Sequence, residues 1–364
     1  MRVAIVTDAW HPQINGVVTT LTKTGEGLAA MGHEVLFMTP EHFRTVPCPT
    51  YPSIHLALNP AGKMSRMLEA FAPQAMHIAT EGPLGWAARS YCRKRGIAFT
   101  TSYHTQFPQY IKLRAPVPMS LSYAVLRRFH GAAARTMAAT PSLRRELRRQ
   151  RFRNVVIWPR GVDTDLFRPE NKIVLEAPRP IAMYAGRVAV EKNIEAFLAL
   201  DLPGTKYVVG DGPDLERLRR KYPAVRFTGF KKHSELAAHV AAADVFVFPS
   251  RTDTFGLVML EAMACGVPVA AFPVTGPVDV VRNGETGVLD EDMGMAVRAA
   301  LRLDGRVCRE YALTRSWRQA TECFAANLVN NSESLAQARE PEEYETAHGS
   351  SAVGAQASMA AEES

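Results

Sequence analysis

The sequence lacks any long hydrophobic run. No stretch approaches the roughly 20 consecutive apolar residues that a membrane-spanning helix needs, and the first apolar run, residues 3–6, ends just before Thr7 and Asp8. Such a run predicts a β-strand and not a signal peptide. The five cysteines are scattered, odd in number and never spaced as CxxC, which argues against a disulfide framework and against a zinc site. A reducing, cytoplasmic compartment is the simplest expectation for this chain.

Acidic residues are scarce in the N-terminal half. Through Asp165 there are 21 Lys+Arg against 9 Asp+Glu, a net charge of +12, whereas the remainder has 22 against 27, a net charge of −5. Nine of the arginines lie within residues 127–153, where Glu146 is the only acid. This asymmetry predicts a polyanionic or membrane partner for the first half.

A nucleic acid is one such partner, and a nucleic-acid-binding protein is therefore an alternative that charge alone raises. Residues 127–153 lack the interleaved aromatic residues that single-strand binders use. No recognised nucleic-acid-binding module occurs in the chain. The expected partners therefore do not include nucleic acid.

Short apolar, β-branched runs alternate with amphipathic stretches along 364 residues, which is too long for one ordinary core. Strands are expected at 3–8, 34–39, 53–58, 75–80, 97–102, 136–140 and 154–159, and again at 180–186, 205–210, 224–229, 244–250, 268–272 and 286–290. Helices are expected at 17–31, 84–95, 119–135, 141–150, 191–200, 213–222, 233–242 and 256–265. Apolar strands joined by helices predict parallel sheets that are covered on both faces.

Two such series predict an α/β protein with two doubly wound, Rossmann-like domains that face each other across a cleft. We expect an N-terminal domain at 1–168, a proline-rich linker at 169–179 and a C-terminal domain at 180–330, whose last helix can cross back to the first domain. Residues 331–364 are acidic, Ser/Ala-rich and poor in aromatic residues, and this composition predicts a disordered tail. Ligands of parallel sheets bind beyond the carboxyl ends of the strands, so the site is expected in the cleft.

Three positions of the first half follow predicted strands. Gly16 lies at the turn that opens the helix at 17–31, where a missing Cβ lets a ligand approach, although it is equally readable as a loop glycine. His104 follows the strand at 97–102 and can bond a hydroxyl or transfer a proton, while a lone histidine is more often structural. Glu81, in the loop ATEGPLG, can accept a hydroxyl on the acceptor side.

Residues 244–268 combine a strand, a polar loop and an apolar helix. Phe255 and Gly256 precede the helix, and the amides of Gly256 and Leu257 are expected to form an anion site at its N-terminus. Asp253 in the loop and Glu261 in the helix can accept hydrogen bonds from sugar hydroxyls. The alternatives are a helix cap for Asp253 and a solvated charge for Glu261. A carboxylate within so apolar a helix needs a partner, which favours function for Glu261.

Arg187 and Lys192 lie where the strand at 180–186 ends. Two cations at the carboxyl end of a buried strand are poor core residues but suitable ligands for a diphosphate. The loop VGDGPDLE at 209–216 places glycines at a neighbouring strand end.

The combination of GR–x4–K at 186–192, GDGP at 210–213 and FG–x4–EAMACG at 255–266 resembles the retaining GT-B glycosyltransferases of family 4. The resemblance extends over nearly the whole chain to about residue 330. The turn NGV at 15–17 and the stretches TEGPLG and SYHTQFPQY are most similar to the branch that glycosylates lipids, which includes phosphatidylinositol mannosyltransferases, sulfoquinovosyl-diacylglycerol synthases and diacylglycerol glycosyltransferases.

The resemblance implies that the N-terminal domain holds the acceptor and the C-terminal domain holds a nucleotide-sugar. It implies donor-site roles for two groups of residues, the donor-binding Gly16, Asp253, Phe255, Gly256, Leu257 and Glu261, and the catalytic His104, Arg187 and Lys192. Arg187 and Lys192 would hold the diphosphate, Glu261 the ribose and Asp253 the sugar. The family usually has Glu where this chain has Asp253, so the sugar and its UDP or GDP carrier stay open.

The implied reaction is a retaining hexosyl transfer with no cofactor and no metal. The DTD at 163–165 imitates a metal-binding motif, but it reads as a turn before the linker, and the two cations supply the charge that a metal would supply. The acceptor is expected to be a membrane lipid such as diacylglycerol or phosphatidylinositol, reached by peripheral association with the anionic inner face of the cell membrane. A soluble or polysaccharide acceptor is the alternative, and the oligomeric state is not predicted.

Overall fold

The computed structural model describes residues 1–13, 15–48, 51–112 and 117–332. Residues 1–331 form one compact unit. Most of the predicted tail lies outside the described residues. Asn331, its first residue, is buried, and its side chain bonds the backbone of Ala98 in both directions, at 3.0 and 2.9 Å.

The first half of the chain forms a six-stranded parallel sheet with the strand order β2-β1-β5-β6-β7-β8. The strands are β1 Arg2–Val6, β2 Glu34–Met38, β5 Ala75–Ile78, β6 Thr100–Tyr103, β7 Arg135–Ala138 and β8 Val155–Ile157. Helices of this half are α1 Gly16–Ala30, α2 Ala61–Phe71, α3 Pro83–Lys94, α4 Phe107–Lys112, α5 Met119–His130 and α6 Pro141–Arg149.

The second half forms another six-stranded parallel sheet, with the order β11-β10-β9-β12-β13-β14. Its strands are β9 Ile181–Ala185, β10 Thr205–Val209, β11 Arg226–Gly229, β12 Val245–Phe248, β13 Val269–Ala271 and β14 Gly287–Leu289. Its helices are α7 Glu195–Leu198, α8 Leu215–Lys221, α9 His233–Ala241, α10 Leu257–Ala264, α11 Pro277–Val280, α12 Met293–Ala300, α13 Gly305–Leu313 and α14 Trp317–Asn327. The predicted fold class, two doubly wound α/β sheets, is confirmed.

Each sheet is covered on both faces because successive side chains of a strand point to opposite sides. In β1, Val3 and Ile5 pack with Leu21 of α1, whereas Ala4 and Val6 pack with Met64 of α2 on the other face.

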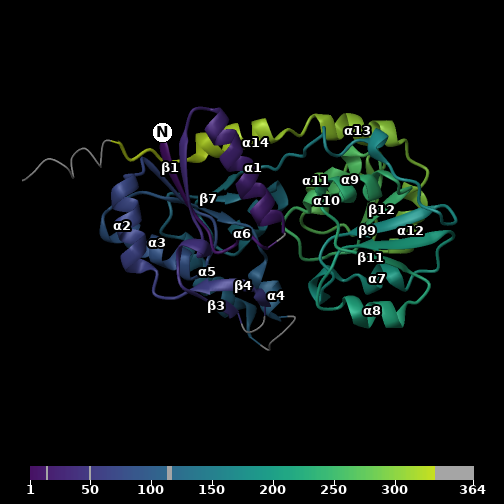
Figure 1. Ribbon diagram of the computed structural model, residues 1–364, viewed down its shortest axis with the longest axis horizontal. Coiled ribbons are helices and arrows are strands. Elements are labelled where there is room, and N and C mark those ends of the chain that lie inside the picture. The colour runs from purple at the N-terminus through teal and green to yellow at the C-terminus, as the bar shows by residue number, and fades with distance from the viewer. Residues whose placement is uncertain (14, 49–50, 113–116, 333–364) are drawn as a thin grey trace, which may run out of the picture. The chain divides into compact units, whose positions relative to one another are not determined.

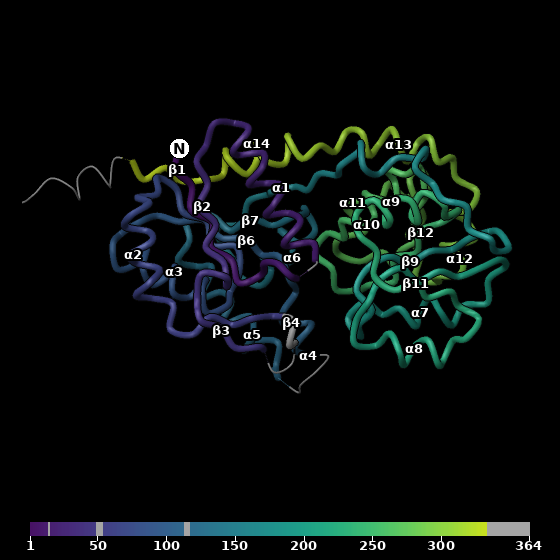
Figure 2. Tube along the Cα trace, viewed as in Figure 1, coloured from purple at the N-terminus to yellow at the C-terminus, as the bar shows by residue number. Residues whose placement is uncertain are grey.

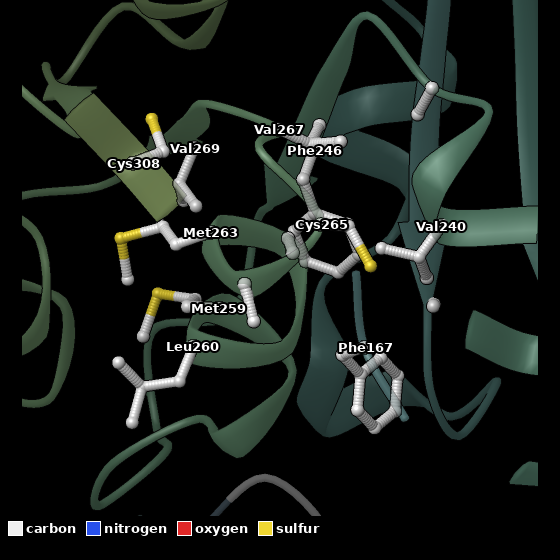
Figure 3. Packing of buried hydrophobic residues seen from close by; sticks show 14 of the residues in the cluster. Phe167, Val240, Phe246, Met259, Leu260, Met263, Cys265, Val267, Val269 and Cys308 are labelled. Atoms are coloured by element: carbon white, nitrogen blue, oxygen red, sulfur yellow. The ribbon is translucent and has the colours of Figure 1, made fainter. Parts of the chain in front are cut away.

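The second sheet repeats this arrangement. Met183 of β9 packs with Met259 and Met263 of α10 in the cluster shown in Figure 3, and Tyr184 packs with Phe197 of α7 in the cluster on the opposite face.

The last helix packs on the first sheet, far from its neighbours in sequence. Phe324 of α14 is fully buried in the cluster that contains Val3 and Ile5. In Figures 1 and 2 the yellow end of the chain runs beside the purple α1, and a Cβ on Gly27 of α1 would lie 2.6 Å from the Thr321 hydroxyl.

Two predicted elements differ in form from the sequence expectations. The strand expected at 53–58 is β4 Tyr51–Ala57, and it pairs antiparallel with β3 Thr45–Cys48 in a separate hairpin instead of entering the parallel sheet. Its alternation of Ile54 and Leu56 with His55 is typical of a half-exposed strand. The helix expected at 191–200 is a 3₁₀ turn, Val190–Lys192, followed by the short α7, because Asn193 adopts a left-handed φ of 51° between them.

The helix α2 was not predicted, although Met64 and Leu68 lie four residues apart on its buried face. Cys92, Cys265, Cys308 and Cys323 have free thiols. Within the described ranges, no helix has both the length and the hydropathy that crossing a membrane requires.

Candidate active site

The carboxyl edge of the second sheet holds an ion pair between two of the predicted residues. Lys192 Nζ lies 2.5 Å from Asp253 Oδ1, and the two side chains are only 20% and 16% exposed. Burial by itself lowers the pKa of Lys192, but the Asp253 carboxylate outweighs it, so the pKa is raised and the amine stays charged. The second carboxylate oxygen, Oδ2 of Asp253, is buried and has no hydrogen-bond donor among the residues described here.

Arg187 lies in the loop between β9 and the 3₁₀ turn that carries Lys192. Its carbonyl accepts a hydrogen bond from the Tyr184 hydroxyl at 2.7 Å. The GDGP loop after β10 holds the other side of this segment, because the Val188 amide donates to Asp211 O and the Asp214 amide donates to Val188 O. The glycine loop at 210–213 therefore lies against the Arg187 loop and positions it.

Gly256 is the N-cap of α10 and directly follows Phe255, which packs against the buried cluster of Figure 3. No side chain of the described residues caps this helix end, so the amides of Leu257 and Val258 are available to a ligand, whereas the Met259 amide donates to Gly256 O at 3.0 Å. Gly256 has a φ of 84°, and a Cβ there would lie 2.7 Å from the Met259 side chain. Glycine is therefore required both by backbone conformation and by space.

Glu261 lies in the second turn of α10. Burial raises the pKa of its carboxyl to about 7. Within the described part of the chain, no side-chain hydrogen bond or ion pair reaches this carboxyl. The hydrogen-bond partner that was expected for Glu261 is thus not supplied by the residues that the structure describes. The carboxyl is therefore available to a ligand.

His104 follows β6 and is held by two neighbours. The Arg160 guanidinium donates to Nδ1 at 3.3 Å, and Nε2 lies 2.8 Å from the Ser102 hydroxyl. Because arginine has no acceptor, Nδ1 must be unprotonated and Nε2 must carry the hydrogen. Burial, and then the Arg160 charge, hold the pKa of His104 well below its usual range. His104 is therefore neutral, and both of its nitrogens are occupied, which argues against a role as general base.

Arg160 was missed by the sequence analysis. It is 5% exposed, and its guanidinium donates to the carbonyls of Trp158 and Pro159 at 2.6 and 3.1 Å. Burial lowers its pKa to about 9, so it stays charged at neutral pH. The signal was present, since Arg160 follows the strand at 155–157 just as Arg187 follows β9.

The loop ATEGPLG, whose Glu81 was expected on the acceptor side, packs closely against other protein atoms. The Asp8 carboxylate accepts from the amides of Leu84 and Gly85 at 2.8 and 3.3 Å and so caps α3. A Cβ on Gly82 would lie 2.4 Å from this carboxylate, so glycine is needed there for packing. Glu81 is likewise engaged, because its Oε1 lies 3.0 Å from Nε2 of His130.

Gly16 is the first residue of α1, and the Asn15 side chain caps the helix through the amides of Val17 and Val18. A Cβ on Gly16 would meet the Leu257 side chain at 3.4 Å. The structure also brings His104 toward the Asp253 loop, since the Thr254 hydroxyl donates to His104 O at 2.7 Å.

The DTD stretch does not gather acidic ligands in the structure. Asp163 lies 3.6 Å from Lys23 Nζ and accepts from the Leu166 amide at 3.1 Å. No group of three or more His, Cys, Asp or Glu side chains that could hold a metal occurs in the ranges that the structure covers.

The raised pKa of Glu261 makes a prediction about stability. Its folded-state pKa of about 7 exceeds the ordinary value of 4.5, so ionisation costs stability progressively as the pH rises from 4.5 to 7. At 1.36 kcal/mol per pKa unit, the full cost is on the order of 3 kcal/mol. Glu261→Gln should therefore raise the free energy of unfolding at pH 8 by about 1–3 kcal/mol and leave it nearly unchanged at pH 4, below the ordinary pKa.

Urea denaturation of both proteins at the two pH values measures this difference. Glu285→Gln, at an exposed acid in the same half of the chain, is the control. An equal effect of Glu261→Gln at both pH values would contradict the raised pKa of this half-buried carboxyl.

Comparisons with known proteins agree with this fold. Residues 14–166 match the family described as Glycosyltransferase Family 4, and residues 179–303 match the family described as Glycosyl transferases group 1. A GDP-mannose-dependent alpha-mannosyltransferase of Mycolicibacterium smegmatis is 33% identical over 352 residues, 87% of this chain and 94% of that protein.

Two further matches concern the acceptor branch and the fold. A GDP-mannose-dependent alpha-(1-6)-phosphatidylinositol dimannoside mannosyltransferase of Mycobacterium tuberculosis is 28% identical over 90% of this chain and 96% of that protein. The solved structure of sucrose-phosphate synthase from Thermosynechococcus elongatus has a TM-score of 0.73 at 23% identity and covers 93% of this chain and 99% of its own.

The predicted resemblance to the lipid-glycosylating branch is thus confirmed, as is the predicted enzyme class, a hexosyltransferase. This chain belongs to the family 4, group 1 glycosyltransferases and has their GT-B fold.

Proposed function

We propose that this enzyme transfers a hexose from a nucleotide-diphospho-sugar to a hydroxyl of a membrane lipid, with retention of anomeric configuration. One observation carries the donor half of the proposal. Arg187, the Lys192–Asp253 pair and the uncapped N-terminus of α10 all lie at the carboxyl edge of the second sheet. Ligands of parallel sheets bind at this edge.

The donor diphosphate is held by cations and amides. Arg187 and Lys192 supply positive charge, and the amides of Leu257 and Val258 supply hydrogen-bond donors at the positive end of a helix dipole. Relatives named for GDP-mannose make it the first donor to test. The free oxygen of Asp253 accepts a sugar hydroxyl, and the carboxyl of Glu261 accepts the ribose hydroxyls.

The reaction needs no base from the protein. The bond between the anomeric carbon and the diphosphate oxygen breaks, and the acceptor oxygen bonds that carbon from the same face. The acceptor proton moves to an oxygen of the departing diphosphate. The state of His104 supports this route. The residue is neutral, and both of its ring nitrogens are already hydrogen-bonded, to Arg160 and to Ser102, so it can line the sugar site without accepting the proton. Charge that develops on the diphosphate is stabilised by groups already in place.

Removal of either cation should slow transfer. Arg187→Ala and Lys192→Ala are each expected to lower kcat/KM by on the order of a hundredfold, because one preorganised contact to the leaving group is lost. The matched control is Arg251→Ala, since Arg251 lies in the same edge loop as Asp253 but is exposed and paired with Glu291. Radiolabelled transfer from GDP-mannose and UDP-glucose to extracted lipid measures the rates.

Lys192→Ala also leaves the Asp253 carboxylate unpaired, so its stability must be checked by urea denaturation. Arg187→Ala leaves that ion pair intact and separates catalysis from folding. Near-wild-type rates in both variants would refute the diphosphate assignment.

Transfer should persist in excess EDTA, because the two cations supply the positive charge that a divalent metal supplies in other transferases. The measurement is the initial rate before and after chelation. Loss of activity that is restored by magnesium or manganese would contradict this expectation.

A lipid acceptor requires that the enzyme attaches to a membrane. We assign this attachment to the arginine-rich surface of α6 in the N-terminal half. Arg145, Arg148 and Arg149 of α6 are exposed, whereas Leu143 and Leu147 of the same helix are buried in the core. The exposed face of this helix can therefore attract an anionic surface by its charge, whereas the leucines of the helix are not available to insert into a membrane. Each cation near such a surface contributes about 1 kcal/mol.

Binding to vesicles of anionic lipid should weaken at least tenfold when Arg145, Arg148 and Arg149 are changed to serine. It should also weaken with salt, since screening shortens to about 3 Å at 1 M. Liposome co-sedimentation at low and high salt measures both effects. The control changes Arg217, Arg219 and Arg220 of α8, exposed arginines of the other half, to serine.

Equal pelleting of the two triple variants would refute the α6 face. Wild-type protein that does not pellet at all would favour the soluble acceptor instead.

A further inference from the structure

A hollow of about 280 Å³ opens in the N-terminal half, beside the loop that follows β1. Trp10 and His11 of that loop line one part of it, and Glu41, Phe43, Thr45 and His55, from the segment that follows β2 and the β3–β4 hairpin, line the rest. The hollow thus lies beyond the carboxyl ends of β1 and β2, which is the edge of the first sheet where ligands are expected. None of the donor-site residues lines it.

Two aromatic rings form its apolar surface. The Trp10 ring packs against Phe37 at a centroid distance of 4.6 Å and an interplanar angle of 33°, so its position is fixed by the protein. Phe43 packs against the core of the first sheet and lines the same hollow. Such rings offer flat apolar faces, which suit the C–H face of a saturated ring.

The polar side chains of the hollow suit hydroxyl groups. Glu41 is exposed, and within the described ranges no ion pair engages its carboxylate. A carboxylate accepts hydrogen bonds, and an imidazole can donate through one nitrogen and accept through the other. His55 is oriented by a 3.4 Å contact between its Nδ1 and the Thr45 hydroxyl. An aromatic wall with a few convergent polar groups is the usual composition of a small-molecule site.

An anionic group fits this hollow poorly. The Glu41 carboxylate repels it, and the nearby cation, Lys63, donates to the His42 carbonyl and lies over the Phe43 ring. The volume lies at the lower limit of drug-sized pockets, which are about 300–1,000 Å³. It therefore admits one ring and excludes a pair of acyl chains.

We propose that this hollow is the acceptor subsite for one polyhydroxylated six-membered ring, a hexose or a cyclitol. The proposal rests on the proposed function and narrows it, because it makes the acceptor a lipid whose headgroup carries such a ring instead of bare diacylglycerol. In the first sheet only β5 separates β1 from β6. At about 4.8 Å per strand, the ends of β1 and β6 are about 10 Å apart. A ring bound beside Trp10 thus lies at the same edge of the first sheet as His104, about two strands away.

The test observes ring binding without transfer. Saturation-transfer NMR on the full chain uses methyl α-D-mannopyranoside and myo-inositol as probes, with glycerol as the polyol that has no ring. Wild type should bind both ring probes in preference to glycerol. Trp10→Leu should weaken ring binding about tenfold, and Glu41→Gln about threefold because a charged acceptor becomes a neutral one. Glu34→Gln, at the opposite end of β2, should bind like the wild type.

Affinity for GDP and UDP, measured by calorimetry, separates the two proposals. It should be the same in the wild type and in all three variants. Ring binding that is absent from the wild type, equal to glycerol, or unchanged in both Trp10→Leu and Glu41→Gln would overturn the subsite. Loss of nucleotide binding in the wild type with intact ring binding would overturn the proposed function alone. If Trp10→Leu fails to fold, Glu41→Gln decides, since Glu41 is exposed.

Discussion

The ion pair between Lys192 and Asp253 is the interaction on which the donor side of this enzyme depends. Removing two charges from water is costly, and their mutual attraction offsets that cost only when the geometry is close and the remaining lone pairs are satisfied. Here the geometry is close, at 2.5 Å, but one oxygen of Asp253 has no donor in the described structure. The pair is thus stable enough to hold Lys192 charged and incomplete enough to accept a ligand hydroxyl.

The first sheet carries a second buried polar array with a different charge. Arg160 donates to Nδ1 of His104, and Nε2 of His104 donates to the Ser102 hydroxyl. The same hydroxyl lies 3.1 Å from Nε2 of His77. Burial, with a smaller effect of the Arg160 charge, lowers the pKa of His77 to about 3, so both histidines are neutral. The array has one positive charge, and its hydrogen bonds run from Arg160 through His104 to the Ser102 hydroxyl. Its result is a His104 fixed in one tautomer, a property that suits contact with a substrate better than proton transfer.

Much of the architecture followed from local patterns. Apolar runs such as 180–186 and 244–250 predicted strands that exist at those places, because a strand buried on both faces must be apolar throughout. The hairpin β3–β4 and the break at Asn193 were not predicted, since strand pairing and a left-handed φ depend on contacts that a single segment does not encode. At the site, the rule that polar residues follow strands found Arg187 and His104, yet the same rule was not applied to Arg160.

The sequence by itself determined most strands of the two sheets, the family motifs and the residues at the strand ends, because each of these depends on one short contiguous stretch of the chain. Only the tertiary structure decided which of those residues have partners. It paired Lys192 with Asp253 across 61 positions, Glu81 with His130 across 49 and His104 with Arg160 across 56. It also placed Asp8, and not a ligand, against Gly82. The physical reason is that the burial and charge of a side chain depend on neighbours brought together by folding, and these neighbours lie far apart in the chain.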